Sequence, residues 1–455
     1  MSDLPLRVAV VGSGPAGFYA ADALLKSEDP RVEVDVIDRL PTPWGLVRLG
    51  VAPDHENIKA VSRAFEKTAA KPGFRFFGNV EVGSTVAHEE LLQLYDAVVY
   101  TVGAQTDRRL GIPGEDLPGS WAATAFVAWY NGHPDFQHLE FDLSHERVVV
   151  IGNGNVAIDC ARMLALTPEE LAPTDTTHEA IDAINAAGVR EILMLGRRGP
   201  VQAAFTPPEL KELGELAGAE PVVDPRDLEL DPASRRDLEA DRDRARRNYE
   251  LLEEYAAREA EGKPRRIVLR FLVSPVAILG EDKVEGVEIV RNELVEEDGR
   301  IVARPTGETE VIPAGLVLRS VGYKGVALPD VPFDERSGTI PNDRGRVEGA
   351  ERTYAAGWIK RGPSGVIGTN KKDAAETVEL LLEDARGGKL NRASVDSTQS
   401  LEALLDERDA YYVEYEGWQA IDAAERSMGE PLGRPRVKLH MWEKLLETGL
   451  KKITR

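Results

Sequence analysis

The sequence predicts an α/β protein with two Rossmann-like, doubly wound, three-layer domains, the second inserted into the first. Two glycine-rich turns, at residues 12–17 and 152–157, each lie between a short apolar run and a helix-like stretch, the order expected of a nucleotide-binding βαβ unit. Two further apolar runs, at 95–103 and 315–322, bracket the second turn and indicate where the chain leaves the first domain and returns. The expected boundaries are 1–106 with 323–455 for the first domain, which ends in a helical tail, and 107–322 for the second.

The composition limits the classes of protein to consider. The 455 residues are 42% hydrophobic and 29% charged, as in globular proteins, and the sequence lacks any run of roughly 18 apolar residues that would predict a membrane span. Cys160 is the single cysteine, which excludes an internal disulfide, a CxxC dithiol and a four-cysteine zinc site or iron–sulfur cluster. The formal charge of −22 disfavours nucleic-acid binding. Without a targeting signal in residues 1–6, we expect a cytoplasmic monomer that does not insert into membranes.

The first domain opens with the full strand–turn–helix–strand order. An apolar run at 7–11 predicts a buried strand, a helix-like stretch follows at 18–25, and a second apolar run at 32–37 ends at Asp38. An acid at the end of the second strand is the last part of the dinucleotide-binding pattern.

Each residue of this pattern has a physical task. Gly12 allows the tight turn, Gly14 removes a Cβ so that a pyrophosphate can touch the backbone, and Gly17 lets the helix pack on the strand. The pyrophosphate would lie at the helix N-terminus. Asp38 is an acceptor for a ribose 2′-hydroxyl and would repel a 2′-phosphate, so this site suits the ADP half of FAD or NAD.

The second domain repeats the order with a different ending. A strand is expected at 147–151, a helix at 158–166, a polar insertion at 167–188 and a second strand at 191–195. Ala157 occupies the third glycine position, which the pattern allows. Cys160 falls on the helix, where we expect a buried small apolar residue.

Arg197 and Arg198 stand where the first domain has its acid. Adjacent guanidinium groups attract a 2′-phosphate through charge-assisted hydrogen bonds, so the second site should prefer NADP(H) to NAD(H). The alternative is that both arginines are solvated loop charges.

Two other regions carry helical signals. Residues 234–263 are dense in charge and predict an exposed helix. The chain from about 397 onward predicts a largely helical tail, with pieces at 401–405, 420–428 and 437–450.

A chain with an FAD-like site and an NADPH-like site is built to pass a hydride from nicotinamide to flavin. No catalytic Ser/His/Asp order or HExxH motif competes for the role, so no metal is expected. Two other uses stay open: a redox-sensing module that holds NADP(H) without turnover, and a flavin oxidase or monooxygenase. The electron-input subunit of glutamate synthase and the disulfide reductases both need cysteines that this chain lacks.

Longer motifs are more specific than the glycine turns. They are LPTPWGLVR at 40–48, GVAPDH at 50–55, VIGNGNVA at 150–157, GRRGP at 196–200, FT at 205–206 and AGWIKRGPSGVIGTNK at 356–371. Through these motifs the chain, from about residue 7 to 450, resembles the adrenodoxin-reductase-type ferredoxin–NADP(+) reductases. It is most similar to actinobacterial-type members without an added ferredoxin domain.

The resemblance implies particular site residues. It places FAD contacts at Ala16, Asp38, Leu46, Val82, Trp358, Gly365, Val366 and Ile367. It places NADP(H) contacts at Arg108, Asn153, Gly154, Asn155, Val156, Arg197, Arg198, Glu209 and Gly365. His55 and Glu212 resemble the family's polar pair that supports hydride transfer. The family often has Glu where this chain has Asp38, whose shorter arm keeps the charge.

The residues alone also allow plainer interpretations. A loop histidine such as His55 is often a surface or capping residue. Glu209 and Glu212 follow a Pro-Pro helix start, where acids suit the positive helix end. Trp358 could be core packing.

The resemblance implies that a ferredoxin receives the electrons and feeds cytochrome P450s or other ferredoxin-dependent enzymes. Ferredoxins are usually acidic, so a chain of charge −22 needs local cationic patches to dock one. The favoured patch comprises Arg434, Arg436, Lys438, Lys444, Lys451, Lys452 and Arg455, with Lys360, Arg361, Lys371 and Lys372 near the flavin. The alternative patch on the charged helix comprises Arg235, Arg236, Arg242, Arg244, Arg246 and Arg247, and its interleaved acids favour a plain solvated surface.

Overall fold

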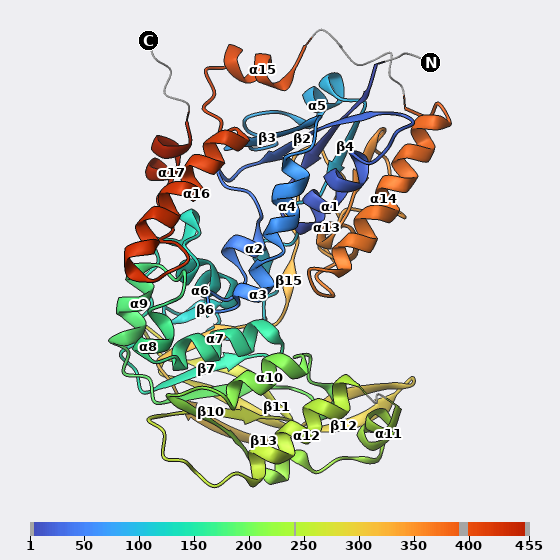
Figure 1. Ribbon diagram of the computed structural model, residues 1–455. Coiled ribbons are helices and arrows are strands. Elements are labelled where there is room, and N and C mark those ends of the chain that lie inside the picture. The colour runs from blue at the N-terminus through green and yellow to red at the C-terminus, as the bar shows by residue number, and fades with distance from the viewer. Residues whose placement is uncertain (1–3, 241–242, 391–398, 451–455) are drawn as a thin grey trace. The chain divides into compact units, whose positions relative to one another are not determined.

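The computed structural model describes residues 4–240, 243–390 and 399–450, which form two compact units. Unit 1 is drawn from 1–106, 322–432 and 436–455, and unit 2 from 107–321 and 433–435. Unit 2 is therefore an insertion in the chain of unit 1 (Figure 1). The short strands β5 (Thr106–Asp107) and β15 (Tyr323–Lys324) pair with each other where the chain changes unit.

A seven-stranded sheet is the middle layer of unit 1. Its strands are β1 (Leu6–Val11), β2 (Val32–Asp38), β3 (Phe74–Gly78), β4 (Ala97–Tyr100), β16 (Asn342–Asp343), β17 (Arg346–Val347) and β18 (Thr353–Ala355). Their order is β16-β17-β18-β4-β1-β2-β3. All neighbours from β18 to β3 are parallel, and β16 and β17 join antiparallel at one edge. The glycine turn therefore lies at the carboxyl end of a central parallel strand, where open α/β sheets bind ligands.

Both faces of this sheet are covered, which explains why β1 is apolar throughout. Val8 and Val10 face a core formed with helices α1 (Pro15–Leu24) and α14 (Thr369–Arg386). Ala9 and Val11 face the opposite core, which includes α5 (His88–Leu94) and α15 (Leu401–Glu407). Unit 1 is thus a three-layer structure.

The C-terminal tail completes unit 1. Its helices are α16 (Tyr415–Gly429) and α17 (Trp442–Gly449), with the 3-10 turn η5 (Glu430–Leu432) between them. Trp418 of α16 and Leu445 of α17 pack with Phe18 of α1 in a separate apolar cluster. The other short helices of the unit are α2 (Leu46–Leu49), α3 (Glu56–Lys59), α4 (Ser62–Ala69) and α13 (Trp358–Arg361).

Unit 2 has a fully parallel sheet. Its strands are β6 (Ser120–Ala122), β7 (Arg147–Ile151), β8 (Glu191–Leu195), β9 (Ala219–Val223), β10 (Arg265–Arg270) and β14 (Leu316–Arg319). The order is β6-β14-β7-β8-β10-β9. The turn after β7 therefore repeats the setting of the turn after β1.

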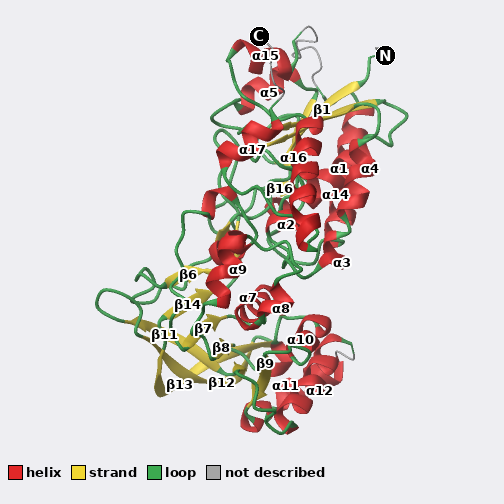
Figure 2. Ribbon diagram, turned by 60° about the vertical axis from the view of Figure 1, so that its left-hand side comes forward, coloured by secondary structure: helices red, strands yellow, loops and turns green. Residues whose placement is uncertain are grey.

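Helices cover one face of the unit 2 sheet and strands cover the other. The helices are α6 (Ala123–Tyr130), α7 (Asn155–Ala165), α8 (Pro168–Leu171), α9 (His178–Asn185), α10 (Pro207–Leu213), α11 (Pro232–Ala240) and α12 (Arg244–Ala257), with 3-10 turns η1 (Pro134–Phe136), η2 (Pro200–Gln202) and η3 (Pro225–Leu228). The covering strands are β11 (Val273–Leu279), β12 (Gly286–Glu297) and β13 (Arg300–Pro313). Val149 and Leu193 pack against the covering strands. Figure 2 shows β11–β13 on the opposite side of the sheet from α10–α12. The predicted three-layer Rossmann-like fold is confirmed, with a β-layer on one side of unit 2.

One expectation about a segment was wrong. Residues 234–263 do not form a single exposed helix, because α12 places Leu252 and Tyr255 in the main core of unit 2. The many charged residues of this segment lie on the outer faces of its helices. They make the few inward-facing apolar positions difficult to recognise in the sequence. Cys160 is buried in the same core, as predicted, and burial raises the pKa of its thiol well above the usual range.

Within the described ranges, every helix is too short or too polar to cross a lipid bilayer.

Candidate nucleotide sites in the two units

The glycine turn of unit 1 is shaped by backbone contacts. Gly12 has φ +104°, and a Cβ there would lie 2.8 Å from the carbonyl carbon and oxygen of Thr101. A Cβ on Gly17 would collide with the carbonyl oxygen of Gly12. A Cβ on Gly14, by contrast, would meet no protein atom within 4 Å. Gly12 and Gly17 are therefore required for folding of the turn. The middle glycine, Gly14, faces open space at the N-terminus of α1.

Asp38 closes the far side of this turn. Its carboxylate accepts hydrogen bonds from the Ser13 amide (2.7 Å), the Ser13 hydroxyl (2.5 Å) and the Leu40 amide (2.9 Å). Burial outweighs these bonds and raises the pKa of Asp38. Two carboxylate oxygens can accept about four hydrogen bonds, so one acceptor position remains for a ribose hydroxyl.

The loop after β2 touches the glycine turn. The Trp44 amide donates to the Ser13 carbonyl at 2.9 Å, and a Cβ on Gly45 would lie 3.0 Å from the Gly14 Cα. The next residue, Leu46, leaves 38% of its surface exposed. Leu46 thus directly follows the residue that lies against Gly14. Val82, in contrast, is buried within the core below the sheet.

The segment before α14 reaches the same turn. Gly357 has φ +79°, and a Cβ there would lie 2.6 Å from the Cβ of Ala16. Trp358 is half-buried and donates its Nε1–H to the Ser364 carbonyl at 3.2 Å. Its ring centre lies 5.3 Å from that of Tyr323.

The loop that follows presents an apolar side chain to the surface. Gly365 has φ +78°, and Val366 is 60% exposed. The Val366 amide donates to Thr369 Oγ1 at 3.1 Å, and Ile367 packs against the cluster that contains Trp418. Exposed Val366 and Leu46 are the kind of apolar surface that a flat ring system would cover. His55 is half-buried at the start of α3, and its side chain does not cap that helix.

Unit 2 repeats the glycine geometry. Gly152 has φ +141°, and a Cβ there would collide with the Ser320 carbonyl, while a Cβ on Gly154 would meet no protein atom within 4 Å. The Asn153 carbonyl accepts from the Ala204 and Phe205 amides at 3.0 and 3.1 Å. These bonds hold the turn against the next loop.

Two neighbouring residues complete this turn. Asn155 Oδ1 accepts from the Thr206 amide at 2.8 Å, and Val156 is half-buried in the first turn of α7. The Asn155 side chain is therefore committed to shaping the site.

Three arginines, Arg197, Arg198 and Arg244, give this part of unit 2 a local positive charge. Arg197 is exposed and Arg198 half-buried just after β8. Burial and the positive charges of Arg197 and Arg244 lower the pKa of Arg198. Like charges gathered in this way favour an anion. The sequence places Arg244 only on the charged helix, because no local spacing links it to the arginine pair.

The other expected unit 2 residues lie apart from this cluster. Arg108 is exposed near the start of the unit, and Glu209 is buried in α10. Glu212, one turn later, pairs with Arg162 Nε at 3.3 Å.

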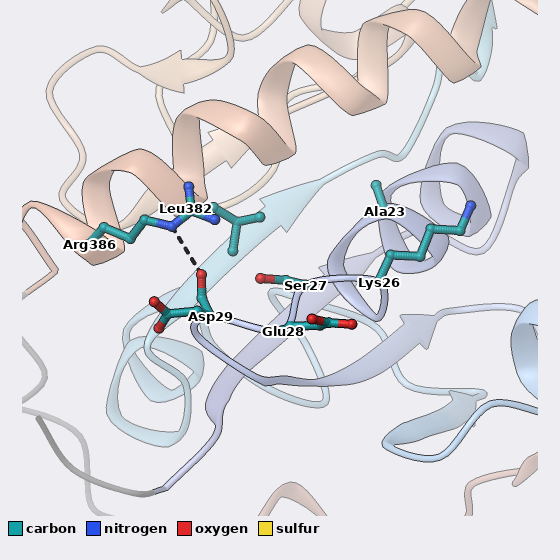
Figure 3. Close-up of a pocket in the computed structure, with 7 residues that line it drawn as sticks. All are labelled: Ala23, Lys26, Ser27, Glu28, Asp29, Leu382 and Arg386. Carbon is teal, nitrogen blue, oxygen red and sulfur yellow. Dashed lines mark hydrogen bonds between the residues drawn. The ribbon is translucent and has the colours of Figure 1, made fainter.

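Two surface hollows lie at the opposite, amino ends of the sheets. In unit 1, a hollow of about 600 Å³ is formed at the end of α1 and α14, where Arg386 Nε donates to the Asp29 carbonyl at 3.0 Å (Figure 3). In unit 2, one of about 710 Å³ includes Arg147, Arg190 and Glu191. Neither contains a glycine turn.

Part of the favoured cationic patch is buried. Arg434 is buried and donates to the carbonyls of Thr174 and Thr176. Arg436 pairs with Glu425 and Asp422, and Lys438 is buried. These cations form hydrogen bonds and ion pairs within the protein and do not face the solvent. A count of cations along the sequence does not reveal this.

The other cations of the patch are paired with neighbouring side chains, exposed, or outside the described residues. Lys444 pairs with Glu447, and Lys451, Lys452 and Arg455 lie outside the described residues. Near Gly365, Lys360 pairs with Asp373 and Glu376, and Arg361 bonds Asn370. Lys371 and Lys372 are exposed at the start of α14.

Comparisons with known proteins agree with this geometry. The family model for pyridine nucleotide-disulphide oxidoreductases matches residues 6–172. The NADPH-ferredoxin reductase FprA of Mycobacterium tuberculosis is 52% identical over 98% of this chain and 99% of its own. The mitochondrial NADPH:adrenodoxin oxidoreductase of Arabidopsis thaliana is 41% identical over 98% and 95%.

Solved structures extend the likeness to three dimensions. The structure of Mycobacterium tuberculosis FprA in complex with NADPH superposes with a TM-score of 0.94, at 51% identity over 98% of this chain and 100% of that one. Because such relatives cover nearly the whole chain, the protein belongs to the adrenodoxin-reductase-type family of ferredoxin–NADP(+) reductases, which are FAD- and NADP(H)-dependent oxidoreductases.

Proposed function

We propose that this protein accepts a hydride from NADPH on bound FAD and passes single electrons to a ferredoxin-type iron–sulfur protein. One observation carries the proposal: the two glycine turns have the same open position but end in opposite charge. Asp38 is the last residue of the second strand in unit 1, and Arg197 and Arg198 come just after the second strand in unit 2. An acid favours a free ribose hydroxyl and a guanidinium pair favours a 2′-phosphate.

In unit 1, we assign FAD to the turn at Gly12, Gly14 and Gly17. The open space at Gly14 admits the pyrophosphate, and Asp38 keeps one acceptor for the ribose. Ala16, Leu46, Val82, Trp358 and the loop Gly365, Val366 and Ile367 would surround the remaining parts. When bound, FAD supplies the conversion between two-electron and one-electron transfer, which side chains do not provide.

In unit 2, we assign NADP(H) to the turn at Asn153, Gly154, Asn155 and Val156. Arg197 and Arg198 would hold the 2′-phosphate, while Arg108, Glu209 and Gly365 would contact other parts of the dinucleotide. His55 and Glu212 are proposed to support hydride transfer. The ion pair with Arg162 keeps Glu212 in a fixed orientation.

The acceptor is inferred from relatives and from the cysteine content. Relatives are named for ferredoxin and adrenodoxin. With a single cysteine, the chain has no iron–sulfur cluster of its own, so the cluster must reside on a partner. Such a partner would feed cytochrome P450s or other ferredoxin-dependent enzymes.

An anaerobic titration with NADPH tests the first half of the reaction. The purified protein should show a visible flavin band that bleaches with about one NADPH per flavin. A colourless protein, or a flavin that ignores NADPH, would support the NADP(H)-sensing alternative.

Mixing the reduced protein with an acceptor tests the second half. Oxidised ferredoxin should reoxidise the flavin much faster than dissolved oxygen does. Rapid reoxidation by oxygen and none by ferredoxin would support a flavin oxidase or monooxygenase.

Replacing the arginine pair tests the nucleotide assignment. The variant Arg197→Ala with Arg198→Ala should raise the KM for NADPH by about tenfold or more, since hydrogen bonds to charged groups contribute about 1.5–3 kcal/mol each. The KM for NADH should change little, because NADH lacks the 2′-phosphate. An equal loss with both nucleotides would refute the assignment.

A further inference from the structure

The C-terminal helices of unit 1 hold a buried ion pair that faces the loop beside the glycine turn. Glu425 of α16 is fully buried, and Arg48 at the end of α2 is 4% exposed. Arg48 Nη1 donates to Glu425 Oε2 at 2.8 Å, and Nη2 donates to Oε1. The pair joins positions 377 residues apart in the chain.

Glu425 accepts hydrogen bonds from two groups besides Arg48. The Leu439 amide donates to Oε1 at 2.8 Å, and Arg436 Nη1 donates to Oε2 at 3.1 Å. Lys438 Nζ donates to the Arg48 carbonyl at 3.1 Å. Arg48 is thus held at both its side chain and its backbone by the tail. A buried network with this many hydrogen bonds favours a single arrangement.

The same helix supports the loop through aromatic contacts. The Arg48 guanidinium lies 5.1 Å from the Trp418 ring centre, and Trp418 meets Trp44 edge-on at 4.8 Å. Trp44 has φ +85°, a conformation that is strained for a bulky residue and needs support from its surroundings. The tail supplies that support.

Two residues of this loop contact the glycine turn that we assign to FAD. Trp44 bonds the Ser13 carbonyl, and Gly45 lies against Gly14. Leu46 is the exposed apolar residue between Gly45 and the ion pair, and Ile367 of the second flanking loop packs on the same aromatic cluster. The loop 44–49 and the loop that contains Ile367 therefore both pack against the C-terminal helices.

We propose that Glu425 is a positioning residue for FAD, which acts through Arg48 to hold the loop 44–49 against the glycine turn. The C-terminal tail then determines how tightly the cofactor is retained. This inference rests on the proposed assignment of FAD to unit 1.

The test compares Glu425→Gln with a matched control, Asp384→Asn. Asp384 is 2% exposed in the same unit and accepts hydrogen bonds from Arg346 Nε (2.9 Å), Arg346 Nη2 (2.7 Å) and the Tyr354 hydroxyl (2.9 Å). Lys389 Nζ also pairs with this carboxylate at 3.0 Å, and none of the three partners belongs to the loop 44–49. Both substitutions thus break a buried network of similar size.

FAD binding is measured by the quenching of FAD fluorescence on titration into each apoprotein, at a temperature where circular dichroism shows both folded. Glu425→Gln should weaken FAD binding by about tenfold or more and alter the shape of the bound flavin absorption band. Asp384→Asn should change the Kd by about twofold at most, even with an equal loss of thermal stability. Equal FAD loss in both variants, or wild-type affinity in Glu425→Gln, would overturn the inference.

A milder variant covers the case in which Glu425→Gln does not fold. Lys438→Met keeps the buried stem and removes only the donor to the Arg48 carbonyl. It should weaken FAD binding by about threefold, and unchanged affinity would overturn the inference. Wild-type protein that binds no FAD would instead refute the proposed function.

Discussion

At the residue scale, the two glycine turns differ in the charge of the side chain at the end of the second strand. Asp38 and Arg198 follow equivalent strands, yet burial shifts their pKa values by the same principle in opposite directions, raising that of the acid and lowering that of the base. Each charge is therefore costly in the absence of a ligand. A ribose hydroxyl or a phosphate would relieve part of that cost.

Asp107 gives a pH prediction at this scale. Burial raises its pKa to about 6, although the Thr124 hydroxyl donates to it and Arg319 lies nearby. The folded protein therefore favours the neutral carboxyl. Stability from this group is fully present below the unfolded pKa of about 3.9 and is lost as the pH rises through about 6.

Asp107→Asn should accordingly raise the free energy of unfolding by about 1–3 kcal/mol above pH 7, with no gain at or below about pH 4. Thermal melts across this range check it. Asp224→Asn is the control of opposite sign, because Arg226 lowers the pKa of Asp224 to about 2. That variant should lose stability at neutral pH. A gain for Asp107→Asn that is independent of pH would contradict the prediction.

At the scale of elements, the strand–turn–helix unit separates folding from binding. Gly12, Gly17 and Gly152 are required because a Cβ would meet the protein backbone. Gly14 and Gly154 face open space in the described structure. The middle glycine of each turn is thus free to serve a ligand.

Alanine at these two positions should remove binding without unfolding the chain. Gly14→Ala should weaken FAD binding and leave NADP(H) binding by unit 2 in place, and Gly154→Ala should do the reverse. Each loss should be about tenfold or more, because the Cβ would occupy space that the pyrophosphate needs. Isothermal titration with FAD and NADP(+) measures both.

Gly17→Ala is the control for this pair, since a Cβ there collides with the Gly12 carbonyl. It should lower the melting temperature of the apoprotein, whereas Gly14→Ala and Gly154→Ala should not. If Gly14→Ala destabilises the apoprotein as much as Gly17→Ala, the middle glycine is structural.

At the scale of the whole molecule, net charge opposes the proposed partner. The formal charge is −22, and an acidic ferredoxin would be repelled at long range. Burial of Arg434 and Lys438 removes much of the expected compensating patch. Lys371 and Lys372 remain exposed beside the loop at Gly365.

Neutralising these lysines tests whether local charge or the net charge of the protein controls the rate of ferredoxin reduction. Lys371→Gln with Lys372→Gln should slow ferredoxin reduction by about three- to tenfold at low ionic strength. Reduction of a small acceptor such as ferricyanide should not change. The control, Arg190→Gln with Lys283→Gln, removes the same charge from the hollow at the amino end of the unit 2 sheet. Equal effects of both pairs would show that only net charge matters.

The sequence by itself determined the local structure and the class of ligand. The runs before Gly12 and Gly152, the glycines themselves, and the residues at 38 and 197–198 are close in sequence. Their chemistry depends on backbone geometry within one βαβ unit, which short-range pattern fixes. The parallel sheets, the two-unit organisation of the chain and the buried Cys160 follow from the same apolar runs.

Only the tertiary structure decided which charges are free and which residues support the site. Arg244 approaches Arg198, and Glu425 holds Arg48, across long separations that leave no local signal. Arg434 and Lys438 resemble surface cations in sequence but fill buried hydrogen-bonding positions. Whether a charge is solvated or buried depends on what packs against it, and that is set by the whole fold.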